Sequence, residues 1–327
     1  MDFIFVAVGL ALLFIAGEAT LRGAIGLAKK LNVSPAVIGL TVVGFGTSAP
    51  EMVVTVQAAL LDQSDLAIGN VVGSNISNLL LILGVGAAIW PLTCEVSAAR
   101  RDAGMMIGTA LLLVALGMTG EIVRWQGVVM LAALFALLGW SYLHDKNSQA
   151  AADGAADDDL HAKEVEEVGE VPSNPWAIGA LTVFGIGGLV FGADLLVDGA
   201  VGIATDLGVP ESIIGLTLVA LGTSLPELAA TVVAALRRHT DVAIANVMGS
   251  CVFNVLAILG VTAIVKPLTI APDIQSIDLW VMLAASLLVL GLLLRGQRIG
   301  RAGGWILLAA YVGYIASMAG RVAPAAI

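Results

Sequence analysis

The chain has 327 residues, of which 59% are hydrophobic and 12% charged, and its formal net charge is −10. Soluble domains carry about 25% charged residues, so this composition excludes a soluble protein and predicts an all-α integral membrane protein with the lipid bilayer as its surroundings. No basic cluster with interleaved aromatic residues occurs, which argues against nucleic acid as a partner. The three histidines and two cysteines are not spaced as zinc or haem ligands are. We therefore expect a protein that has no cofactor and is not an enzyme.

The apolar runs predict ten transmembrane helices of about 20 residues each. The first run follows Asp2, where a signal peptide would carry positive charge, so we expect a retained helix. The ten lie near residues 3–21, 34–60, 65–90, 103–119, 122–143, 176–198, 210–236, 241–265, 276–294 and 303–320.

Lysine and arginine residues alternate between the loops that join these spans. By the positive-inside rule the richer side is cytoplasmic, so both termini face outside the cell (inner) membrane. The richer side holds Arg22, Lys29, Lys30, Arg100, Arg101, Lys146, Lys163, Arg237, Arg238, Arg295, Arg298 and Arg301, and the other side keeps Arg124, Lys266 and Arg321.

Residues 144–173 form a polar stretch in which eight acidic residues lie among small ones between Asp153 and Glu170. Such a segment cannot bury enough apolar area to fold alone, which favours a flexible cytoplasmic loop. A regulatory calcium-sensing loop is the alternative, although EF-hand spacing is absent. The loop divides the chain into residues 1–143 and 174–327, and we expect its deletion to leave transport largely intact.

The two halves are related in sequence. A shift of 176 aligns residues 39–93 with 215–269 without a gap, and 31 of the 55 positions are identical. Each half holds five predicted spans, so the second half enters the membrane in the opposite sense. Inverted repeats of this kind place transported substrate near the bilayer midplane. The sequence therefore predicts two inverted five-helix repeats in which helices 2 and 7 are broken or kinked.

Each repeat carries one copy of a short motif, GTSAPE ending at Glu51 and GTSLPE ending at Glu227. Pro50 lacks an N–H group and clashes with the carbonyl of residue 46, so its helix should break there. The break frees backbone carbonyls near Gly44 and, in the second repeat, near Ala220.

A carboxylate at membrane depth costs about 2.5–3.5 kcal/mol on insertion scales and persists where it has a partner. Neither motif helix carries a basic residue, so Glu51 and Glu227 predict a bound cation. The alternative is a tolerated glutamate that a neighbouring arginine or serine satisfies. Thr47 and Thr223 lie four residues before these glutamates and share their helical faces.

The following span of each repeat adds a second polar stripe. The residues of this stripe are either direct or supporting ligands or hydrogen-bonding contacts between helices. For Asn70 and Asn246 the sequence favours neither interpretation. The ligand candidates on this stripe are Ser74, Asn78, Ser250 and Asn254. Carboxylate, hydroxyl, amide and carbonyl oxygens suit Na⁺, Ca²⁺ or Mg²⁺. Two negative charges neutralise one Ca²⁺ or several Na⁺ but not both loads, and this competition is the physical basis of antiport.

The motifs closely resemble those of the sodium/calcium exchanger family, within the cation/calcium antiporter superfamily. The first repeat reads GTSAPE with GSNISN and the second GTSLPE with GSCVFN. The resemblance covers the ten-span layout and both repeats, leaving out only residues 144–173. It implies that spans one and six slide as a gate past spans two, three, seven and eight.

The resemblance also implies a ligand set. Ca²⁺ would be held by Glu51 and Glu227 with Thr47 and Thr223. The Na⁺ sites would add Ser48, Ser74, Ser224, Ser250 and the backbone oxygens of Gly44 and Ala220.

Two departures from the family pattern bear on ion specificity. Several relatives carry aspartate where Asn254 stands, particularly in the potassium-dependent branch, so this amide weakens the case for K⁺ co-transport. Cys251 replaces the asparagine found at position 75, with no consequence that we can assign. The proton-coupled branch typically has GNxxE in place of the present motif.

We therefore predict a secondary active antiporter that exchanges Na⁺ for Ca²⁺ by alternating access, with electrogenic Ca²⁺ extrusion. H⁺/Ca²⁺ exchange and K⁺-dependent Na⁺/Ca²⁺ exchange are alternatives within the class. A cation channel would show flux without a counter-ion, and a non-transporting membrane sensor would need its acidic loop. Monomer and homo-oligomer both stay open.

Overall fold

A computed structural model describes residues 1–94, 96–152, 174–207, 220–296 and 298–322. The chain is mostly helical, which confirms the predicted class of membrane protein. Within these described ranges six helices are long and apolar enough to cross a bilayer, and a bent pair supplies a seventh span. The six are Asp2–Leu31, Ser64–Ile89, Arg124–Asp145, Pro175–Asp206, Thr240–Val265 and Ile274–Arg295.

The three other predicted spans are not among these seven. The predicted span at 103–119 lies in α7 (Val96–Gly117), whose first turns carry Arg100, Arg101 and Asp102. The last span corresponds to α17 (Arg301–Val322). The span at 210–236 is described from Ala220 onward, and residues 208–219 lie outside the described part.

The first half begins with a long helix, followed by a broken span, a continuous span and two further helices. The elements are α1 (Asp2–Leu31), α2 (Pro35–Ile38), the π-helical turn η1 (Gly39–Val43), α3 (Gly44–Thr47), α4 (Ala49–Leu60), α5 (Ser64–Ser77), the π-helical turn η2 (Asn78–Ile82), α6 (Leu83–Ile89), β1 (Leu92–Thr93), α7, β2 (Glu121–Ile122) and α8 (Arg124–Ala152).

The second half repeats this order. Its elements are α10 (Pro175–Asp206), α12 (Ala220–Gly222), α13 (Leu225–Leu236), α14 (Thr240–Phe253), the π-helical turn η4 (Asn254–Leu259), α15 (Gly260–Val265), β3 (Leu268–Thr269), the π-helical turn η5 (Ile274–Asp278), α16 (Leu279–Gly296), β4 (Arg298–Ile299) and α17.

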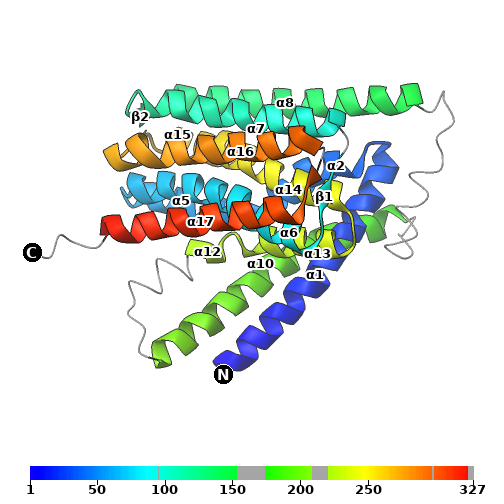
Figure 1. Cartoon of the computed structure of the whole chain (residues 1–327), viewed down its shortest axis with the longest axis horizontal. Coiled ribbons are helices and arrows are strands. Elements are labelled where there is room, and N and C mark those ends of the chain that lie inside the picture. Colours follow the sequence, from blue (N-terminus) through cyan, green and yellow to red (C-terminus); the bar gives the residue numbers. More distant parts are fainter. Residues whose placement is uncertain (95, 153–173, 208–219, 297, 323–327) are drawn as a thin grey trace, which may run out of the picture.

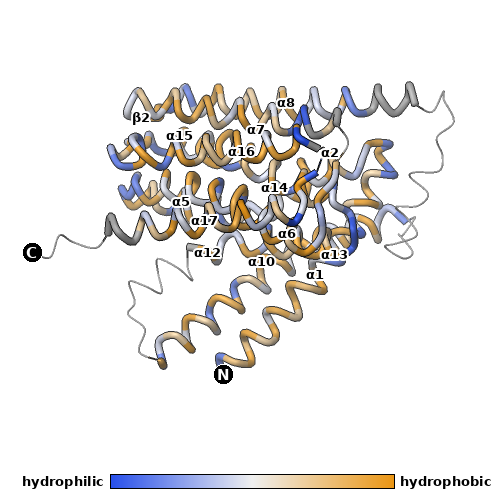
Figure 2. Tube along the Cα trace, viewed as in Figure 1, coloured by the Kyte–Doolittle hydropathy of each residue, from blue (hydrophilic) through white to orange (hydrophobic). Residues whose placement is uncertain are grey.

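Most helices lie in stacked, nearly parallel layers, and α1 and α10 run side by side obliquely to them (Figure 1). Apolar residues cover the lengths of the helices, and polar residues gather near their ends (Figure 2). The most buried spans are Ser64–Ile89 and Thr240–Val265, with 72% and 89% of their apolar windows inside the protein. These two helices carry the predicted second polar stripes, so the stripes lie at the centre of the molecule.

The short strands repeat the internal symmetry at the two ends of the bundle. β1 pairs with β4 through Leu92 and Ile299, and β2 pairs with β3 through Ile122 and Leu268. β1 and β3 are equivalent under the shift of 176, yet β1 and β2 lie at opposite ends of the layered helices (Figure 1). The equivalent strands β1 and β3 therefore lie at opposite ends of the molecule.

The first residues of the predicted flexible loop are helical. α8 continues to Ala152, past the predicted loop start at residue 144, and residues 153–173 lie outside the described part. The Asp145 carboxylate accepts hydrogen bonds from Ser34 N (2.7 Å) and Ser34 Oγ (3.0 Å), and lies 3.6 Å from Arg101 Nη1. A deletion that begins at 144 would therefore remove a contact between α8, α7 and the start of α2.

We expect Asp145→Asn to destabilise the protein by about 1–3 kcal/mol, because Arg101 and the Ser34 N–H would lose a charged acceptor. Replacing the acidic residues between 153 and 173 by amides should leave stability and transport unchanged. Thermal unfolding in detergent measures the first effect. Equal melting temperatures for Asp145→Asn and the wild type would refute this role.

Glu18 forms ion pairs with two arginines. α1 continues to Leu31, so Glu18 lies within the helix, and its side chain is 14% exposed. Its Oε1 pairs with Arg22 Nη2 (2.9 Å) and its Oε2 with Arg237 Nε (2.7 Å). The carboxylate thus joins α1 to the end of α13.

Candidate ion-binding site

Both motif helices break where the sequence predicts. α3 ends at Thr47 and α4 begins at Ala49, and the two segments of this span are bent by 45°. In the second half α12 ends at Gly222 and α13 begins at Leu225. Each proline stands at the first turn of the helix after the break, where its missing N–H costs least. Each glutamate follows one residue later, in the first turn.

The two glutamates meet at the centre of the protein through reciprocal hydrogen bonds. Ser48 Oγ donates to Glu227 Oε1 (3.0 Å), and Ser224 Oγ donates to Glu51 Oε1 (3.1 Å). Each serine therefore binds the glutamate of the opposite half. Since Ser48 and Glu51 lie one turn apart on the same chain segment, the reciprocal bonds bring the two carboxylates near each other.

The second oxygen of each carboxylate has no hydrogen-bond partner in the described part of the chain. Glu51 and Glu227 are 1% and 0% exposed, and the Oε2 atom of each is buried without a hydrogen bond among the described residues. Among those residues no lysine, arginine or histidine forms an ion pair with either glutamate. A buried pair of carboxylates is strongly unfavourable without a counter-charge, so the arrangement calls for a cation between the two halves.

Hydroxyl and carbonyl oxygens from the predicted ligand set lie along the same breaks. Thr47 Oγ1 donates to Val43 O (3.1 Å), whereas Thr223 Oγ1 is buried without a hydrogen bond among the described residues. The sequence predicted a free carbonyl near Gly44, but Gly44 O accepts hydrogen bonds from Ser48 N (3.3 Å), Thr47 Oγ1 (3.4 Å) and Ser250 Oγ (3.5 Å). All three bonds are long, so a cation could replace them. Ala220 begins α12.

The second polar stripes carry further unpartnered oxygens. Asn78 and Asn254 each begin a π-helical turn, a local widening that often marks functional sites. Their side chains are 1% exposed, and both Oδ1 atoms are buried without a hydrogen bond among the described residues. Ser74 and Ser250, one turn earlier, are buried as well. The structure thus brings the polar stripes into the same buried interior as the motifs.

The asparagines at positions 70 and 246 act as contacts between helices. Asn70 Nδ2 donates to Thr55 Oγ1 (3.0 Å) and Glu51 O (3.4 Å). Asn246 Nδ2 donates in the same way to Thr231 Oγ1 (3.2 Å) and to the backbone of the second motif glutamate. Of the two interpretations left open for these residues, the geometry favours support of the glutamate helices.

Asn75 was missed as a functional candidate. Its Oδ1 accepts from Asn254 Nδ2 (3.0 Å), and its Nδ2 lies 3.4 Å from Cys251 O. It therefore orients an amide whose oxygen faces the buried interior from the opposite half. The only signal in the sequence was its place within the GSNISN stripe. The cysteine that replaces it in the second repeat is a buried free thiol.

Gly249 lets α14 approach the backbone of the broken span. A Cβ atom placed there would overlap the carbonyl oxygen of Leu40 and lie 2.8 Å from Leu40 Cα. Small residues permit such close helix contacts in membranes. The contact sets the position of the neighbouring Ser250 relative to Gly44.

We expect Gly249→Ala to cost about 1–3 kcal/mol of stability, because the added methyl group must push two backbones apart. Transport should fall with it, since Ser250 would shift from Gly44. Thermal unfolding and transport assays measure the two effects. Gly313→Ala on α17 is the matched control, because a Cβ there meets no described atom within 4 Å. A stable, fully active Gly249→Ala protein would contradict the close contact.

Two uncompensated buried carboxylates, surrounded by hydroxyl and amide oxygens inside an apolar helical protein, define a membrane transporter of hard cations. The described residues hold no group of three histidine, cysteine, aspartate or glutamate side chains that would make a resident metal site. Residues 1–143 and 177–319 match the model of the family described as sodium/calcium exchanger protein. The chain belongs to this family and is a membrane antiporter of Ca²⁺ and a counter-cation.

Individual relatives resemble the chain over nearly its full length. CaxA, a candidate antiporter of Alkalimonas amylolytica, is 38% identical over 95% of this chain and 96% of its own. The sodium/calcium exchanger MaX1 of Methanosarcina acetivorans is 32% identical, with 96% and 97% covered. A solved structure of the sodium-calcium exchanger NCX_Mj, soaked with Na⁺ and Sr²⁺, matches with a TM-score of 0.81 at 30% identity, covering 97% and 98%.

Proposed function

We propose that the chain exchanges Na⁺ for Ca²⁺ across the cell (inner) membrane, with more Na⁺ charge than Ca²⁺ charge moved per cycle. The observation that carries the proposal is the pair of orphan Oε2 atoms on Glu51 and Glu227, one from each half. Two negative charges neutralise one Ca²⁺, and the same oxygens hold several Na⁺ only after Ca²⁺ has left. The relatives named as sodium/calcium exchangers support these two ions as the substrates.

The proposed ligands are the carboxylates with the hydroxyl and carbonyl oxygens of the breaks and the stripes. Ca²⁺ takes six to eight oxygens at flexible geometry, and this set supplies that number. The set comprises Glu51, Glu227, Thr47, Thr223, Ser48, Ser224, Ser74, Ser250, Asn78, Asn254 and the carbonyls of Gly44 and Ala220.

Alternating access would use ten spans arranged as two inverted repeats, residues 1–143 and 174–327. The placement of equivalent strands at opposite ends of the bundle supports the inversion (Figure 1). Two contacts that the repeat relates to each other also support the inversion. Arg238 lies 4.6 Å from the centre of the Trp90 ring, and the equivalent residues Asp62 and Lys266 form an ion pair at 2.6 Å.

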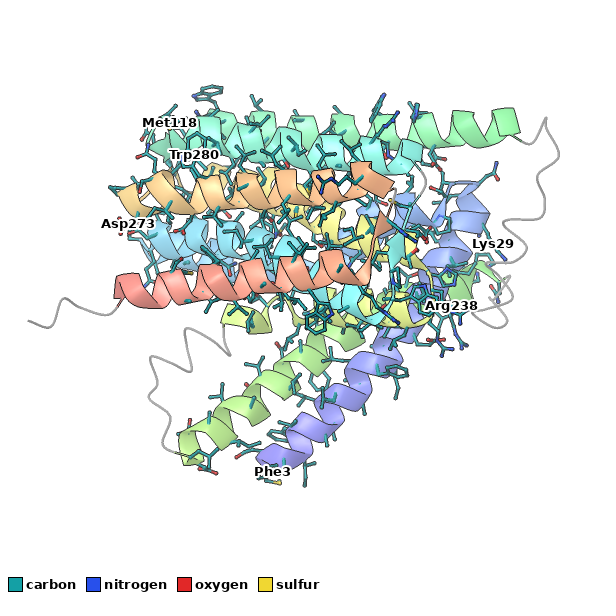
Figure 3. All side chains as sticks on the ribbon, viewed as in Figure 1. Phe3, Lys29, Met118, Arg238, Asp273 and Trp280 are labelled. Carbon is teal, nitrogen blue, oxygen red and sulfur yellow. The ribbon has the colours of Figure 1, made fainter. Side chains whose placement is uncertain are left out.

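The proposed orientation places the end with Lys29 and Arg238 in the cytoplasm and the end with Asp273 outside. Figure 3 shows the two basic residues at one end of the bundle and Asp273, with Met118 and Trp280, at the other. This distribution supports the positive-inside assignment, with both termini outside. The connecting residues 153–173 would then be cytoplasmic.

The test is ⁴⁵Ca²⁺ uptake into proteoliposomes under Na⁺, K⁺ or H⁺ gradients imposed one at a time. We expect an outward Na⁺ gradient alone to drive uptake. An inside-positive potential should accelerate it, because each net charge that leaves gains about 2.3 kcal/mol per 100 mV. Uptake driven by a pH gradient alone would replace this proposal with H⁺/Ca²⁺ exchange. An added requirement for K⁺ would indicate K⁺-dependent exchange, and non-saturable flux a channel.

A further inference from the structure

One ion pair ties the oblique helix α1 to the bundle at its basic end, the end that holds Lys29 and Arg238 (Figures 1 and 3). Glu18 Oε2 accepts a hydrogen bond from Arg237 Nε at 2.7 Å, and its Oε1 lies 2.9 Å from Arg22 Nη2. Both carboxylate oxygens are therefore used, and the Glu18 side chain is only 14% exposed. None of these three residues belongs to the proposed ion ligands, so ion binding does not account for the contact.

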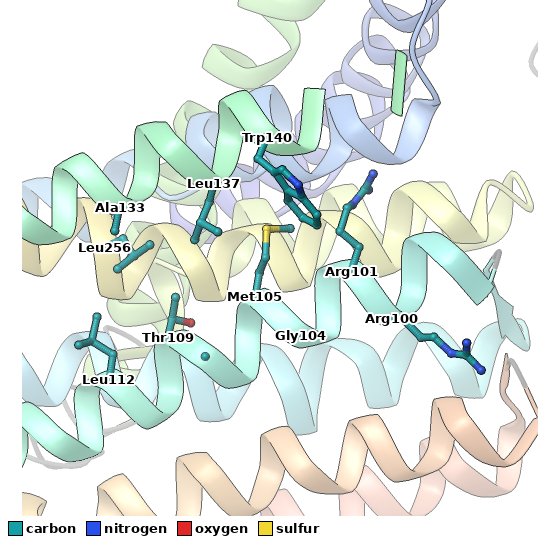
Figure 4. A pocket seen from close by; sticks show the side chains of 11 residues that line it. Arg100, Arg101, Gly104, Met105, Thr109, Leu112, Ala133, Leu137, Trp140 and Leu256 are labelled. Atoms are coloured by element: carbon teal, nitrogen blue, oxygen red, sulfur yellow. The ribbon is translucent and has the colours of Figure 1, made fainter. Parts of the chain in front are cut away.

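α1 also closes the interior of the protein toward the basic end. A cavity of only about 10 Å³, room for about one water molecule, remains between α1, η1, α13 and α14. The groove between α7 and α8, on the side of the bundle away from α1, has about 440 Å³ by comparison (Figure 4). The residues that line the small cavity include Gly17, Thr20 and Leu21 of α1 and Ala230, Val242 and Asn246 opposite. α1 thus packs over Asn246, one helical turn from the proposed ligand Ser250.

The equivalent region at the opposite end of the bundle is less closed. The shift of 176 pairs Val242 with Leu66 and Asn246 with Asn70. Val242 and Asn246 are 3% and 1% exposed, whereas Leu66 is 54% exposed and Asn70 is half-buried. The structure therefore closes the interior more tightly toward the basic end than toward the opposite end.

The internal repeat does not reproduce the ion pair. The same shift pairs Glu18 with Asp194, Arg22 with Asp198 and Arg237 with Leu61. Asp194 and Asp198 are exposed, and within the described ranges no lysine, arginine or histidine forms an ion pair with either. Leu61 is 70% exposed and apolar, so position 61 offers no cation for an equivalent contact.

We propose, on the basis of the alternating access proposed above, that the Glu18–Arg237 ion pair is a latch that favours the state closed toward the basic end. In a protein built of inverted repeats, the second state arises when the two halves exchange conformations. Residues that are the same in both halves then contribute alike to both states, and the positions that differ set the balance. A contact made in one state only shifts the equilibrium by its own free energy. In the second state Asp194 would meet Leu61, and no latch would form.

The rate at which engineered cysteines react with a water-soluble maleimide tests the latch, in the purified full chain and in Na⁺ solution. Val242→Cys reports access from the basic end, and the equivalent Leu66→Cys reports access from the opposite end. We expect Arg237→Leu to raise Val242→Cys labelling roughly two- to fivefold, as for loss of a part-exposed ion pair, without raising Leu66→Cys labelling. Peptide mass spectrometry separates these adducts from any on the native Cys94 and Cys251.

Leu61→Arg supplies the missing cation at the opposite end and should act in the same direction. Paired with Asp194, the added arginine would stabilise the state closed toward that end, so Val242→Cys labelling should again rise roughly two- to fivefold. A merely structural role of Arg237 does not predict this rise, because Leu61→Arg removes no ion pair. Arg237→Lys keeps the charge and Leu61→Gln adds none, so both controls should leave labelling unchanged.

The latch requires both rises. It is wrong if either variant leaves Val242→Cys labelling unchanged or raises labelling at both reporters alike, with melting temperatures confirming that every variant is folded. Labelling does not depend on transport, so this outcome is separate from that of the ⁴⁵Ca²⁺ uptake test. A protein that failed the uptake test could still show these changes, and a Na⁺/Ca²⁺ exchanger that passed it could lack them.

Discussion

We expect Glu51→Gln and Glu227→Gln each to reduce Na⁺-driven ⁴⁵Ca²⁺ uptake by roughly a hundredfold or more. Each substitution removes one of the two buried charges that would balance Ca²⁺, and loss of one partner of a buried ion pair costs about 3–5 kcal/mol. At about 1.4 kcal/mol per factor of ten, this corresponds to at least two orders of magnitude in Ca²⁺ affinity. The two variants should be affected alike, because the serine–glutamate contacts are reciprocal.

Thermal unfolding with and without Ca²⁺ separates a lost ligand from a lost fold. Ca²⁺ should raise the melting temperature of the wild type, since a ligand that binds only the folded state stabilises it. Both glutamine variants should fold but lose this stabilisation. Glu121→Gln is the control, because Glu121 is an exposed residue in β2 far from the motifs. Uptake near the wild-type rate in either variant would require a different ligand set.

The parts of the site that depend on local chemistry could be predicted from the sequence. Pro50 breaks its helix wherever the helix lies, so the bend before Ala49 follows from one residue type. The repeat and the two motifs likewise predicted that Glu51 and Glu227 play equivalent roles. Their burial with free Oε2 atoms agrees with the expected absence of a basic partner.

Contacts between distant segments could not be predicted in the same way. Ser48 lies one turn before Glu51, so the sequence alone suggests a contact within that turn, whereas its hydroxyl binds Glu227. This pairing depends on how the two breaks approach each other in space. The π-helical turn at Asn78 has no compositional signal, because only its hydrogen-bond register differs from an α-helix.

The length of α8 beyond its membrane span could not be predicted for a different reason. Hydropathy detects where a helix leaves the apolar layer, and this happens near residue 144. The residues that follow include alanine, lysine and glutamine, which favour a helix in water as well, so α8 continues to Ala152. The contact of Asp145 with Ser34 joins segments 111 residues apart and needed the structure.

Release of ⁴⁵Ca²⁺ from loaded proteoliposomes should be at least about a hundredfold slower when the outer solution contains neither Na⁺ nor Ca²⁺. After the ion leaves, the carrier can return only with an empty site. Two bare carboxylates would then have to cross a region closed to water, where even one unpaired charge costs several kcal/mol. Bound Na⁺ or Ca²⁺ removes this cost, so either ion on the outside should restore rapid release.

A calcium ionophore provides the control, because it must release the trapped ion at once in the ion-free solution. The double variant Glu51→Gln and Glu227→Gln gives the background leak of the vesicles. Fast release from wild-type vesicles into the ion-free solution, above this background, would mean that the empty carrier reorients or that a pore is open. Obligatory exchange would then be wrong even if the two glutamates still bind Ca²⁺, because the unbalanced charge of the empty site is what couples the two ions.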